Sequence, residues 1–469
     1  FVFLGKPWIF IEIPGSSRQI RGVPSFQASF SMALTNDISV SWKILGQPLG
    51  VVRNQLLAAV FNIFSWLNSY SPLRLIAPPP AATDPKRQVV LITGPGGSDR
   101  LCLTDLGERA GVGYNLTSFC PPPLTPPLPL SIAERDATLP PDCVLVQTEH
   151  FSVNYADITI RWGLYESAVK YVGWPMVPGF DISGTVEWAG AETKFAVGDH
   201  VFGVTFFGGY ATRCLVPARQ LLLVPRRLSM AQAACVPSAA ATALHACALA
   251  GFWPKTPPSE NRAALVHSAG GGVGGMLLQV CRLCGFSPVV AVVGSSHKVA
   301  ACRSLGADVV IDKSAVDLWK AARKAAPNGF AAIFDANGLE TLSAGFEHLA
   351  MTGRLISYGF HSNLPSSVGA LNPLNWLKMG FDLFRMPKFD SMRLVLESKG
   401  ILGFNLSFFA NEHGILAAYM EQLSDWLLSG KIVVSEVTEF EMCKVAEAHA
   451  LIQSGRSVGK IVLHTPHAE

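Results

Sequence analysis

The chain carries little charge and lacks the signals of a nucleic-acid-binding or membrane-spanning protein. Only 15% of its 469 residues are charged, and the net charge of +3 comes without a basic tract, so no nucleic-acid partner is expected. The most hydrophobic run, residues 49–67, is interrupted by Asn54, Gln55, Asn62 and Ser65. It lacks the roughly 20 uninterrupted apolar residues of a membrane span, so we predict an amphipathic helix that packs on the body or lies on a membrane surface.

A disulfide framework is not expected either. The 10 cysteines are scattered through a long chain, which favours a reducing compartment. No group of four closely spaced cysteines is present to hold a structural zinc ion. Cys281 and Cys284 form an isolated C-x-x-C pair, and we interpret them as packing residues.

The first 86 residues carry no motif of a folded domain. Residues 1–48 contain four basic and two acidic side chains among many serines, a composition that suits a transit peptide. We predict that residues 1–86 are an extension and linker that serves targeting, a membrane surface or a partner. The composition leaves both a mitochondrial and a cytoplasmic location open.

The most informative stretch is residues 263–281, where a short apolar run leads into five glycines and then into an apolar helix start. Gly270, Gly272 and Gly275 satisfy G-x-G-x-x-G in the order strand, turn, helix that a dinucleotide site requires. The free backbone N–H groups at the start of the helix would hold the phosphates. The cofactor-binding residues predicted here are Gly270, Gly271, Gly272, Val273 and Gly274.

The residues after the next expected strand, 288–293, indicate which dinucleotide binds. An NAD site holds an Asp or Glu about 20 residues past the glycines, to bind the ribose 2′-hydroxyl. This chain has no carboxylate there but has Ser295, which can donate a hydrogen bond, and Lys298, which brings a positive charge. We therefore predict NADPH rather than NADH. The alternative is that Lys298 only solvates a helix start.

The pattern of expected elements predicts an α/β protein with two kinds of sheet. From residue 263 onward strands and helices alternate, which is typical of a Rossmann-type doubly wound parallel sheet. Before it, short β-branched strands with glycine bends are typical of a compact antiparallel barrel, and a last strand at residues 459–463 returns to it. The predicted domains are 1–86 (extension), 87–245 (catalytic), 246–375 (nucleotide-binding) and 376–469 (helical cover and return to the catalytic domain).

Several ordered motifs support a family resemblance that covers residues 89–463. They are Asn-Tyr-Ala-Asp at 154–157, Pro-Gly-Phe-Asp at 178–181, Gly-Asp-His-Val at 198–201, Gly-Tyr-Ala at 209–211 and the glycine turn. With them the chain resembles zinc-free medium-chain dehydrogenases/reductases of the quinone oxidoreductase branch.

Within that branch the chain is most similar to VAT-1 homologues, through residues 375–378, 387–390 and 403–407.

The resemblance implies a GroES-like β-barrel catalytic domain and NADPH in the cleft between the two domains. It further implies hydride transfer to a quinone or an α,β-unsaturated carbonyl, and a homodimer. Asn154 and Tyr165 match family positions that line the cleft, and we predict them as catalytic residues. Thr242 and Tyr358 match positions near the nicotinamide and ribose, and Asn337 is a further predicted cofactor contact.

The family resemblance also argues against a bound metal ion. Position 154 is an asparagine rather than a cysteine, and the motif at 178–181 lacks the histidine that the zinc relatives carry. No metal ligand is therefore predicted.

Structural interpretations of the candidates remain open. Asn154 could only cap a turn, and Tyr165 could be a half-buried core aromatic with a satisfied hydroxyl. His245 and His267, in apolar surroundings, are interpreted as core histidines.

A second functional hypothesis is an accessory subunit with little turnover in a larger, membrane-associated complex. It rests on the hydrophobic extension and on Ile160, where some quinone reductases carry a second tyrosine.

Overall fold

The computed structural model describes residues 81–105, 139–251, 262–361, 381–382, 385–409, 412–434 and 436–468. The expectations for residues 1–80, including the amphipathic helix at 49–67, lie outside this part of the chain. Residues Ser69–Glu469 form one compact unit. Across the described ranges, no helix combines the length and the apolar character that a bilayer crossing needs.

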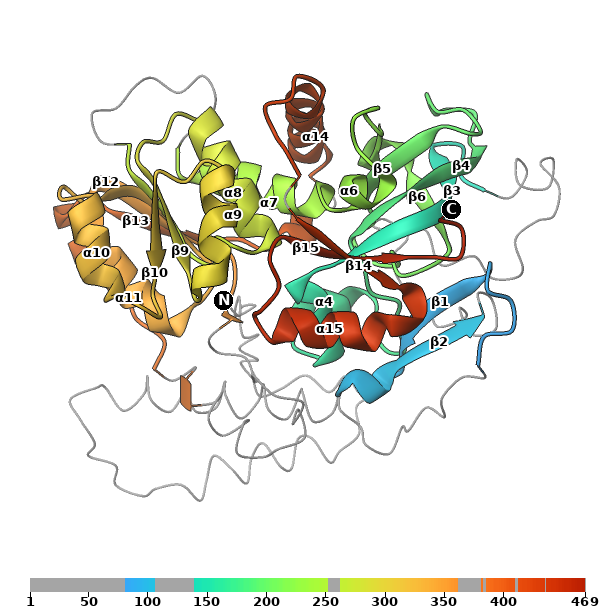
Figure 1. Cartoon of the computed structure of the whole chain (residues 1–469), viewed down its shortest axis with the longest axis horizontal. Coiled ribbons are helices and arrows are strands. Elements are labelled where there is room, and N and C mark those ends of the chain that lie inside the picture. Colours follow the sequence, from blue (N-terminus) through green and yellow to red (C-terminus); the bar gives the residue numbers. More distant parts are fainter. Residues whose placement is uncertain are drawn as a thin grey trace, which may run out of the picture. The chain divides into compact units, whose positions relative to one another are not determined.

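The nucleotide-binding half is built on a six-stranded sheet in which all neighbouring strands are parallel (Figure 1). The predicted Rossmann-type sheet is thus confirmed. Its order is β10 (Val309–Asp312), β9 (Val289–Val293), β8 (Ala264–Val266), β11 (Phe330–Asp335), β12 (Leu349–Ser357) and β13 (Gly400–Gly403). The predicted boundary at residue 375 is wrong for this sheet, because β13 comes from residues beyond it and pairs with β12.

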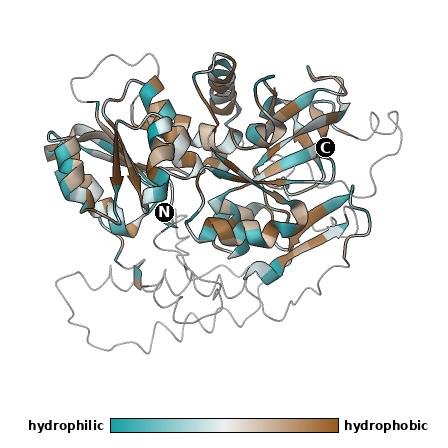
Figure 2. Ribbon diagram, in the orientation of Figure 1, coloured by the Kyte–Doolittle hydropathy of each residue, from teal (hydrophilic) through white to brown (hydrophobic). Residues whose placement is uncertain are grey.

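Helices cover both faces of this sheet, as the alternation predicted (Figure 1). Strand β9 shows the reason most clearly. Val289, Ala291 and Val293 face a core shared with α8 (Gly272–Leu283) and α9 (Val299–Ser304). The intervening Val290 and Val292 face a core shared with α10 (Leu318–Ala325) and α11 (Leu339–Glu347). A strand buried on both faces needs a continuous apolar run, and Figure 2 shows these strands as hydrophobic.

The catalytic half contains a mixed sheet with the order β14-β15-β3-β4-β5-β7, and β6 pairs with β3 off this path. The pairs are antiparallel except β14 with β15. The predicted compact, mostly antiparallel sheet of short strands is confirmed, and among the described residues its path is open at β14 and β7. The strands are β3 (Cys143–Val153), β4 (Asp181–Ala189), β5 (His200–Val204), β6 (Arg213–Pro217), β7 (Leu221–Leu223), β14 (Val437–Glu441) and β15 (Lys460–His464).

A hairpin lies at the start of the described chain. Strand β1 (Gln88–Ile92) pairs with β2 (Leu101–Asp105), and single bridges join β1 to the catalytic half at Ala211 and Met176. Strand β15 pairs antiparallel with β3, so the end of the chain contributes a strand to the catalytic sheet.

Helix α7 (Pro237–Leu249) connects the two halves. Pro237 occupies its first turn, where a proline costs no hydrogen bond. The helix packs on α8 and on α14 (His413–Leu428). It runs without a break through residue 245, so the domain boundary predicted there falls inside a helix.

The interpretation of the C-x-x-C pair as packing residues is confirmed. Cys281 and Cys284 are buried at 0% and 3% exposure. They lie in the core between α7 and α8 together with Cys247, whose Sγ atom is 3.9 Å from that of Cys281. Burial raises the pKa of the Cys247 thiol well above its usual value, which keeps it protonated.

His245 is a core histidine, as predicted. Its side chain lies on α7, packs against the rings of Phe404 and Phe409, and shares a 2.7 Å hydrogen bond between Nδ1 and the Tyr419 hydroxyl. Burial lowers the pKa of His245 to about 4. In the unfolded chain the ring takes up a proton near pH 6.5, whereas in the folded protein it resists protonation until about pH 4.

Acid should therefore destabilise the protein through His245. Its contribution is complete above pH 6.5 and is lost as the pH falls from 6.5 to 4, by about 3 kcal/mol for a pKa shift of this size. His245→Gln removes the titration but keeps an acceptor for Tyr419. Between pH 7 and pH 4, we expect the free energy of unfolding in urea to fall by about 3 kcal/mol less in this variant than in the unsubstituted protein. His200→Gln, at an exposed position, serves as control, and an unchanged acid slope in H245Q would contradict the prediction.

Candidate active site

The glycine turn joins β8 to α8 at the predicted place, with Gly271 as N-cap and Gly272 as first helical residue. A Cβ atom on Gly274 would lie 2.6 Å from the Ala269 Cα atom, and one on Gly275 would lie 2.9 Å from Leu305 Cδ1. These two glycines are needed because helix α8 lies directly against the turn and the next helix. The backbone N–H groups of its first turn are thereby held in one place.

Ser268 is a residue of this turn that the sequence analysis missed. Its φ of 53° lies in the left-handed region, which costs a non-glycine residue about 1–2 kcal/mol. Its hydroxyl donates to Asn337 Oδ1 at 2.9 Å, while the Asn337 backbone N–H donates to the buried Asp335 carboxylate at 2.7 Å. The structure thus brings the predicted cofactor contact Asn337 to the edge of the glycine turn. His267, the preceding residue, is fully buried in agreement with its core interpretation.

A segment near the end of the chain lies beside the glycine turn, which the sequence analysis did not foresee. The Gly459 N–H donates to the Gly270 carbonyl at 3.0 Å, and Gly271 and Gly459 form a parallel bridge. A Cβ atom on Gly272 would lie 2.8 Å from Lys460 Cγ, so the lysine stem covers that glycine. The sequence signal was the pair Gly455 and Gly459, both at positive φ, just before the last strand.

The predicted 2′-phosphate residues lie at the same place. The stem of Lys298 passes over Gly270, where an added Cβ would be 2.7 Å from Lys298 Cδ. Its Nζ donates to the Gly455 carbonyl at 2.5 Å, and burial lowers the pKa of this amine. Beside it, His297 Nε2 lies 3.1 Å from the Arg456 carbonyl.

Ser295 begins the short helix Ser296–Lys298 as its N-cap, in extended conformation. Its backbone carbonyl accepts from the Lys298 N–H at 3.2 Å.

A buried carboxylate, that of Asp181 at the start of β4, organises the predicted catalytic position. Asp181 Oδ2 accepts from Ser152 Oγ at 2.7 Å and from Asn154 Nδ2 at 2.8 Å. Ser238 donates to Asp181 twice, from its backbone N–H to Oδ1 at 2.7 Å and from its hydroxyl to Oδ2 at 2.6 Å. Lys460 Nζ lies 3.4 Å from Asp181 Oδ2 and donates to Asn154 Oδ1 at 2.6 Å. We call these five residues the Asp181 cluster.

Asn154 also has the capping role that was its alternative interpretation, but with its backbone. It is the N-cap of α4 (Tyr155–Arg161), and its N–H donates to Asp157 Oδ2 at 2.8 Å. Asp157 also accepts from the Gly179 N–H at 3.0 Å, and burial raises its pKa to about 7. The Asn154 side chain is thus left for the Asp181 cluster. Thr242 lies one turn after Ser238 on α7 and donates its hydroxyl to the Ser238 carbonyl at 2.7 Å.

Tyr165 belongs to a separate polar group. Its hydroxyl donates to Asn405 Oδ1 at 2.9 Å, and the same oxygen accepts from the N–H and hydroxyl of Ser407. Burial raises the pKa of Tyr165 to about 12, which keeps the phenol protonated. Its ring packs edge-on to Phe180, within a core cluster that also contains the fully buried Ile160. The side chain at position 160 therefore faces the core, and its identity does not argue for lost turnover.

Tyr358, predicted near the ribose, follows β12. Its N–H donates to the Asp335 carbonyl oxygen at 2.9 Å, and its ring stacks on Phe404 with ring centroids 6.3 Å apart. Asp335 thus anchors both Asn337 and Tyr358, through different atoms.

The donors around Asp181 do not suit zinc. The positions near it hold an amide, two hydroxyls and an ammonium group, whereas zinc sites in proteins use thiolates, imidazoles and carboxylates. The positively charged Lys460 Nζ lies beside Asp181 and would repel a metal cation there. Within the described ranges, no three His, Cys, Asp or Glu residues are grouped to hold a metal ion.

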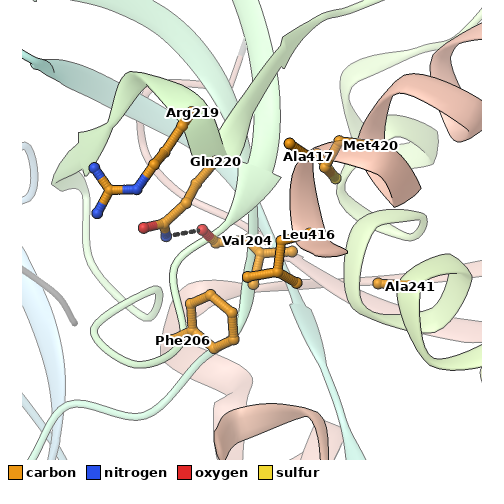
Figure 3. Close-up of a pocket in the computed structure, with 8 residues that line it drawn as sticks. All are labelled: Val204, Phe206, Arg219, Gln220, Ala241, Leu416, Ala417 and Met420. Carbon is orange, nitrogen blue, oxygen red and sulfur yellow. Dashed lines mark hydrogen bonds between the residues drawn. The ribbon is translucent and has the colours of Figure 1, made fainter. Parts of the chain in front are cut away.

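A small apolar cavity lies apart from this cluster, between α14 and the end of β5 (Figure 3). Val204, Phe206 and Leu416 line it, and Gln220 bonds to the Val204 carbonyl at its side. None of the predicted site residues lines it, although Ala241 is the neighbour of Thr242. We therefore place the candidate site at the glycine turn and the Asp181 cluster.

The close contacts of Gly274 predict that a side chain at this position destabilises the protein. Gly274→Ala should lower the free energy of unfolding by about 1–3 kcal/mol, because its Cβ would overlap backbone atoms that cannot move independently. Gly271→Ala is the matched control, since its Cβ would meet only the Ser268 carbonyl oxygen at 3.4 Å. Thermal and urea unfolding of both variants test this. Equal stability of the two variants would refute the assignment of Gly274.

Two domain families match the chain. The alcohol dehydrogenase GroES-like domain matches residues 140–226, and the zinc-binding dehydrogenase family matches residues 272–406.

Curated relatives come from several kingdoms. The chain is 27% identical over 324 residues to a synaptic vesicle membrane protein VAT-1 homolog of Danio rerio, an alignment that spans 69% of this chain and 64% of the relative. It is 26% identical to 2-methylene-furan-3-one reductase of Solanum lycopersicum, over 69% of this chain and 72% of the relative. It is also 26% identical to a probable quinone oxidoreductase of Schizosaccharomyces pombe, over 69% of this chain and 89% of the relative.

Solved structures show the same fold. A quinone oxidoreductase of Pseudomonas syringae matches with a TM-score of 0.62 and 22% identity, over 81% of this chain and 99% of that one. The Escherichia coli quinone oxidoreductase, solved with NADPH, matches with a TM-score of 0.61 and 20% identity, over 80% and 99%. The two domain matches and these relatives support a place for the chain among the medium-chain dehydrogenases/reductases, in the quinone oxidoreductase branch.

Proposed function

We propose that the protein is an NADPH-dependent oxidoreductase that transfers hydride to a quinone or an α,β-unsaturated carbonyl. The observation that carries this proposal is the glycine turn after β8, together with the residues after the neighbouring strand β9. Those residues include basic side chains and no carboxylate. The names of two relatives, a furanone reductase and a quinone oxidoreductase, support the substrate class. The E. coli neighbour, solved with NADPH, supports the cofactor.

The turn is suited to a pyrophosphate. Gly270, Gly271 and Gly272 present backbone without side chains at the start of α8, where the helix dipole and free N–H groups favour an anion. The apolar stem of Lys460 lies over Gly272, while its ammonium group is bonded to Asn154 Oδ1. Gly272→Val should abolish dinucleotide binding, because its side chain would displace the lysine stem and fill the pyrophosphate approach.

The 2′-phosphate would meet the group formed by Lys298, Ser295 and His297. In the folded chain the Lys298 ammonium is bonded to a carbonyl rather than to a carboxylate, so its charge is not neutralised by that contact. A phosphate could replace the Gly455 carbonyl as the acceptor of the Lys298 ammonium at little cost, because a hydrogen bond between two charged groups is stronger than one to a neutral carbonyl.

The bound cofactor would supply the hydride, and the chain supplies position and hydrogen-bond donors. Negative charge that develops on the substrate oxygen needs a donor nearby. Asn154 is suited to this role because only one of its two amide N–H groups is used by Asp181. Tyr165 keeps its proton at neutral pH, but its hydroxyl already donates to Asn405, so its predicted place in the cleft rests on the family resemblance alone.

We further propose that the reaction needs no zinc, because the Lys460 ammonium group occupies the position of a cation next to Asp181. Activity should survive dialysis against a strong chelator.

We propose that the protein forms a homodimer through the edge strand β13 of the six-stranded sheet. Strand β13 ends the six-stranded order, so one side of its backbone has no strand partner in the described chain. Pairing with β13 of a second copy would extend the sheet and satisfy these groups.

Lys298→Ala tests the choice of cofactor. We expect the Kd for NADPH to rise by about tenfold or more, since a charged phosphate contact is lost, while the Kd for NADH changes by less than about twofold. Lys324→Ala, at an exposed position on α10, is the matched control. Titration followed by nucleotide fluorescence measures both constants. Equal losses for the two nucleotides would remove Lys298 from the 2′-phosphate site.

The proposed function itself is tested by oxidation of NADPH over a panel of quinones and enones. We expect acceptor-dependent oxidation that is faster with NADPH than with NADH and insensitive to chelator. Tight NADPH binding without oxidation by any acceptor would contradict the enzyme proposal and favour the accessory-subunit hypothesis.

A further inference from the structure

Lys460 connects the glycine turn to the Asp181 cluster. Its methylene stem lies against Gly272, and its Nζ atom reaches Asn154 Oδ1 at 2.6 Å. The side chain is 6% exposed and Asp181 is fully buried, so the contacts lie away from bulk water. A lysine is rarely buried this deeply unless its charge has a defined partner.

The distances show which partner the ammonium group serves. It lies 3.4 Å from Asp181 Oδ2 but 2.6 Å from the Asn154 amide oxygen. Asp181 already accepts hydrogen bonds of 2.6–2.8 Å from Ser152, Ser238 and Asn154. The best hydrogen bond of the lysine is therefore to the amide, and its pairing with the carboxylate is secondary.

These contacts allow only one orientation of the amide. An ammonium group only donates, so the Asn154 atom that faces it must be the oxygen. An ionised carboxylate only accepts, so the atom that faces Asp181 must be the nitrogen. One N–H of Asn154 is thus bound to Asp181, and no residue of the described chain accepts from the other. A rotated amide would place donor against donor and acceptor against acceptor.

We propose that Lys460 is a positioning residue, whose ammonium group locks the Asn154 amide so that its second N–H is presented to the substrate oxygen. This inference rests on the proposed function. It assigns Lys460 a role in the rate of the reaction, distinct from any contact of its stem with the cofactor. It also places the residue that orients the catalytic amide some 300 positions away in the sequence, on β15.

Lys460→Met tests this role. Methionine has a similar length and keeps the apolar stem over Gly272, but it lacks the donor. We expect kcat to fall on the order of 10- to 100-fold through misplacement of the amide, while the Kd for NADPH stays within about twofold. Lys460→Arg should recover most of kcat because it restores a donor of the same charge. Lys431→Met, at an exposed position, is the matched control and should change neither constant.

A double-mutant cycle separates positioning from general stability. If Lys460 acts through Asn154, the double variant K460M/N154A should be no slower than N154A alone. Multiplication of the two losses in kcat would overturn the proposal. So would an increase in the Kd for NADPH with unchanged kcat, because Lys460 would then be only a cofactor contact.

The same cycle distinguishes failure of this inference from failure of the proposed function. If none of the tested acceptors supports NADPH oxidation by the unsubstituted protein, the proposed function fails. The same double-mutant cycle is then measured by urea unfolding. Non-additive losses of stability in K460M and N154A would still establish the contact that fixes the amide. Additive losses would show that the two side chains act independently and would overturn the positioning role.

Discussion

The arrangement of the site depends on one buried carboxylate. Asp181 is fully buried, and an ionised carboxylate in such surroundings is costly unless donors surround it. The donors come from the end of β3 (Ser152), from the first turn of α7 (Ser238) and from β15 (Lys460). Satisfying this single charge therefore fixes three elements relative to β4. Ser238 adds a backbone N–H at a helix N-terminus, where a negative charge is further stabilised.

The glycine turn is constrained in a comparable way from the other side. Two long side chains, Lys298 and Lys460, lie over Gly270 and Gly272, and the backbone of Gly459 pairs with the turn. The glycines therefore do more than open a path for a phosphate. They also let a segment from the end of the chain lie within hydrogen-bonding distance of the turn. Because Lys460 is shared by the turn and the Asp181 cluster, the proposed nucleotide and substrate positions have a common neighbour.

The sequence predicted the local parts of this site well. The order of strand, glycine turn and helix was visible because each glycine has a local backbone reason, and the two-sided burial of β9 was visible as a continuous apolar run. Domain limits were predicted less well. Residue 245 lies inside α7 and β13 lies beyond residue 375, because helices and sheets recruit distant segments without a change in composition at the boundary. Strand texture and the family resemblance predicted the GroES-like catalytic domain, but not that its sheet path is open among the described residues, because closure depends on where the first and last strands of the sheet meet.

The sequence by itself determined the sheet types, the glycine turn and the absence of a carboxylate after β9, because these follow from periodicity and from residue types at short spacing. It also singled out Asn154, Tyr165 and Lys298. Only the tertiary structure decided what these side chains touch. It placed Asn154 in the Asp181 cluster and Tyr165 in a separate group with Asn405, and it brought Lys460 to both the turn and the amide. The physical reason is that hydrogen bonds between residues far apart in the chain depend on how the sheets pack, which leaves no local pattern in the sequence.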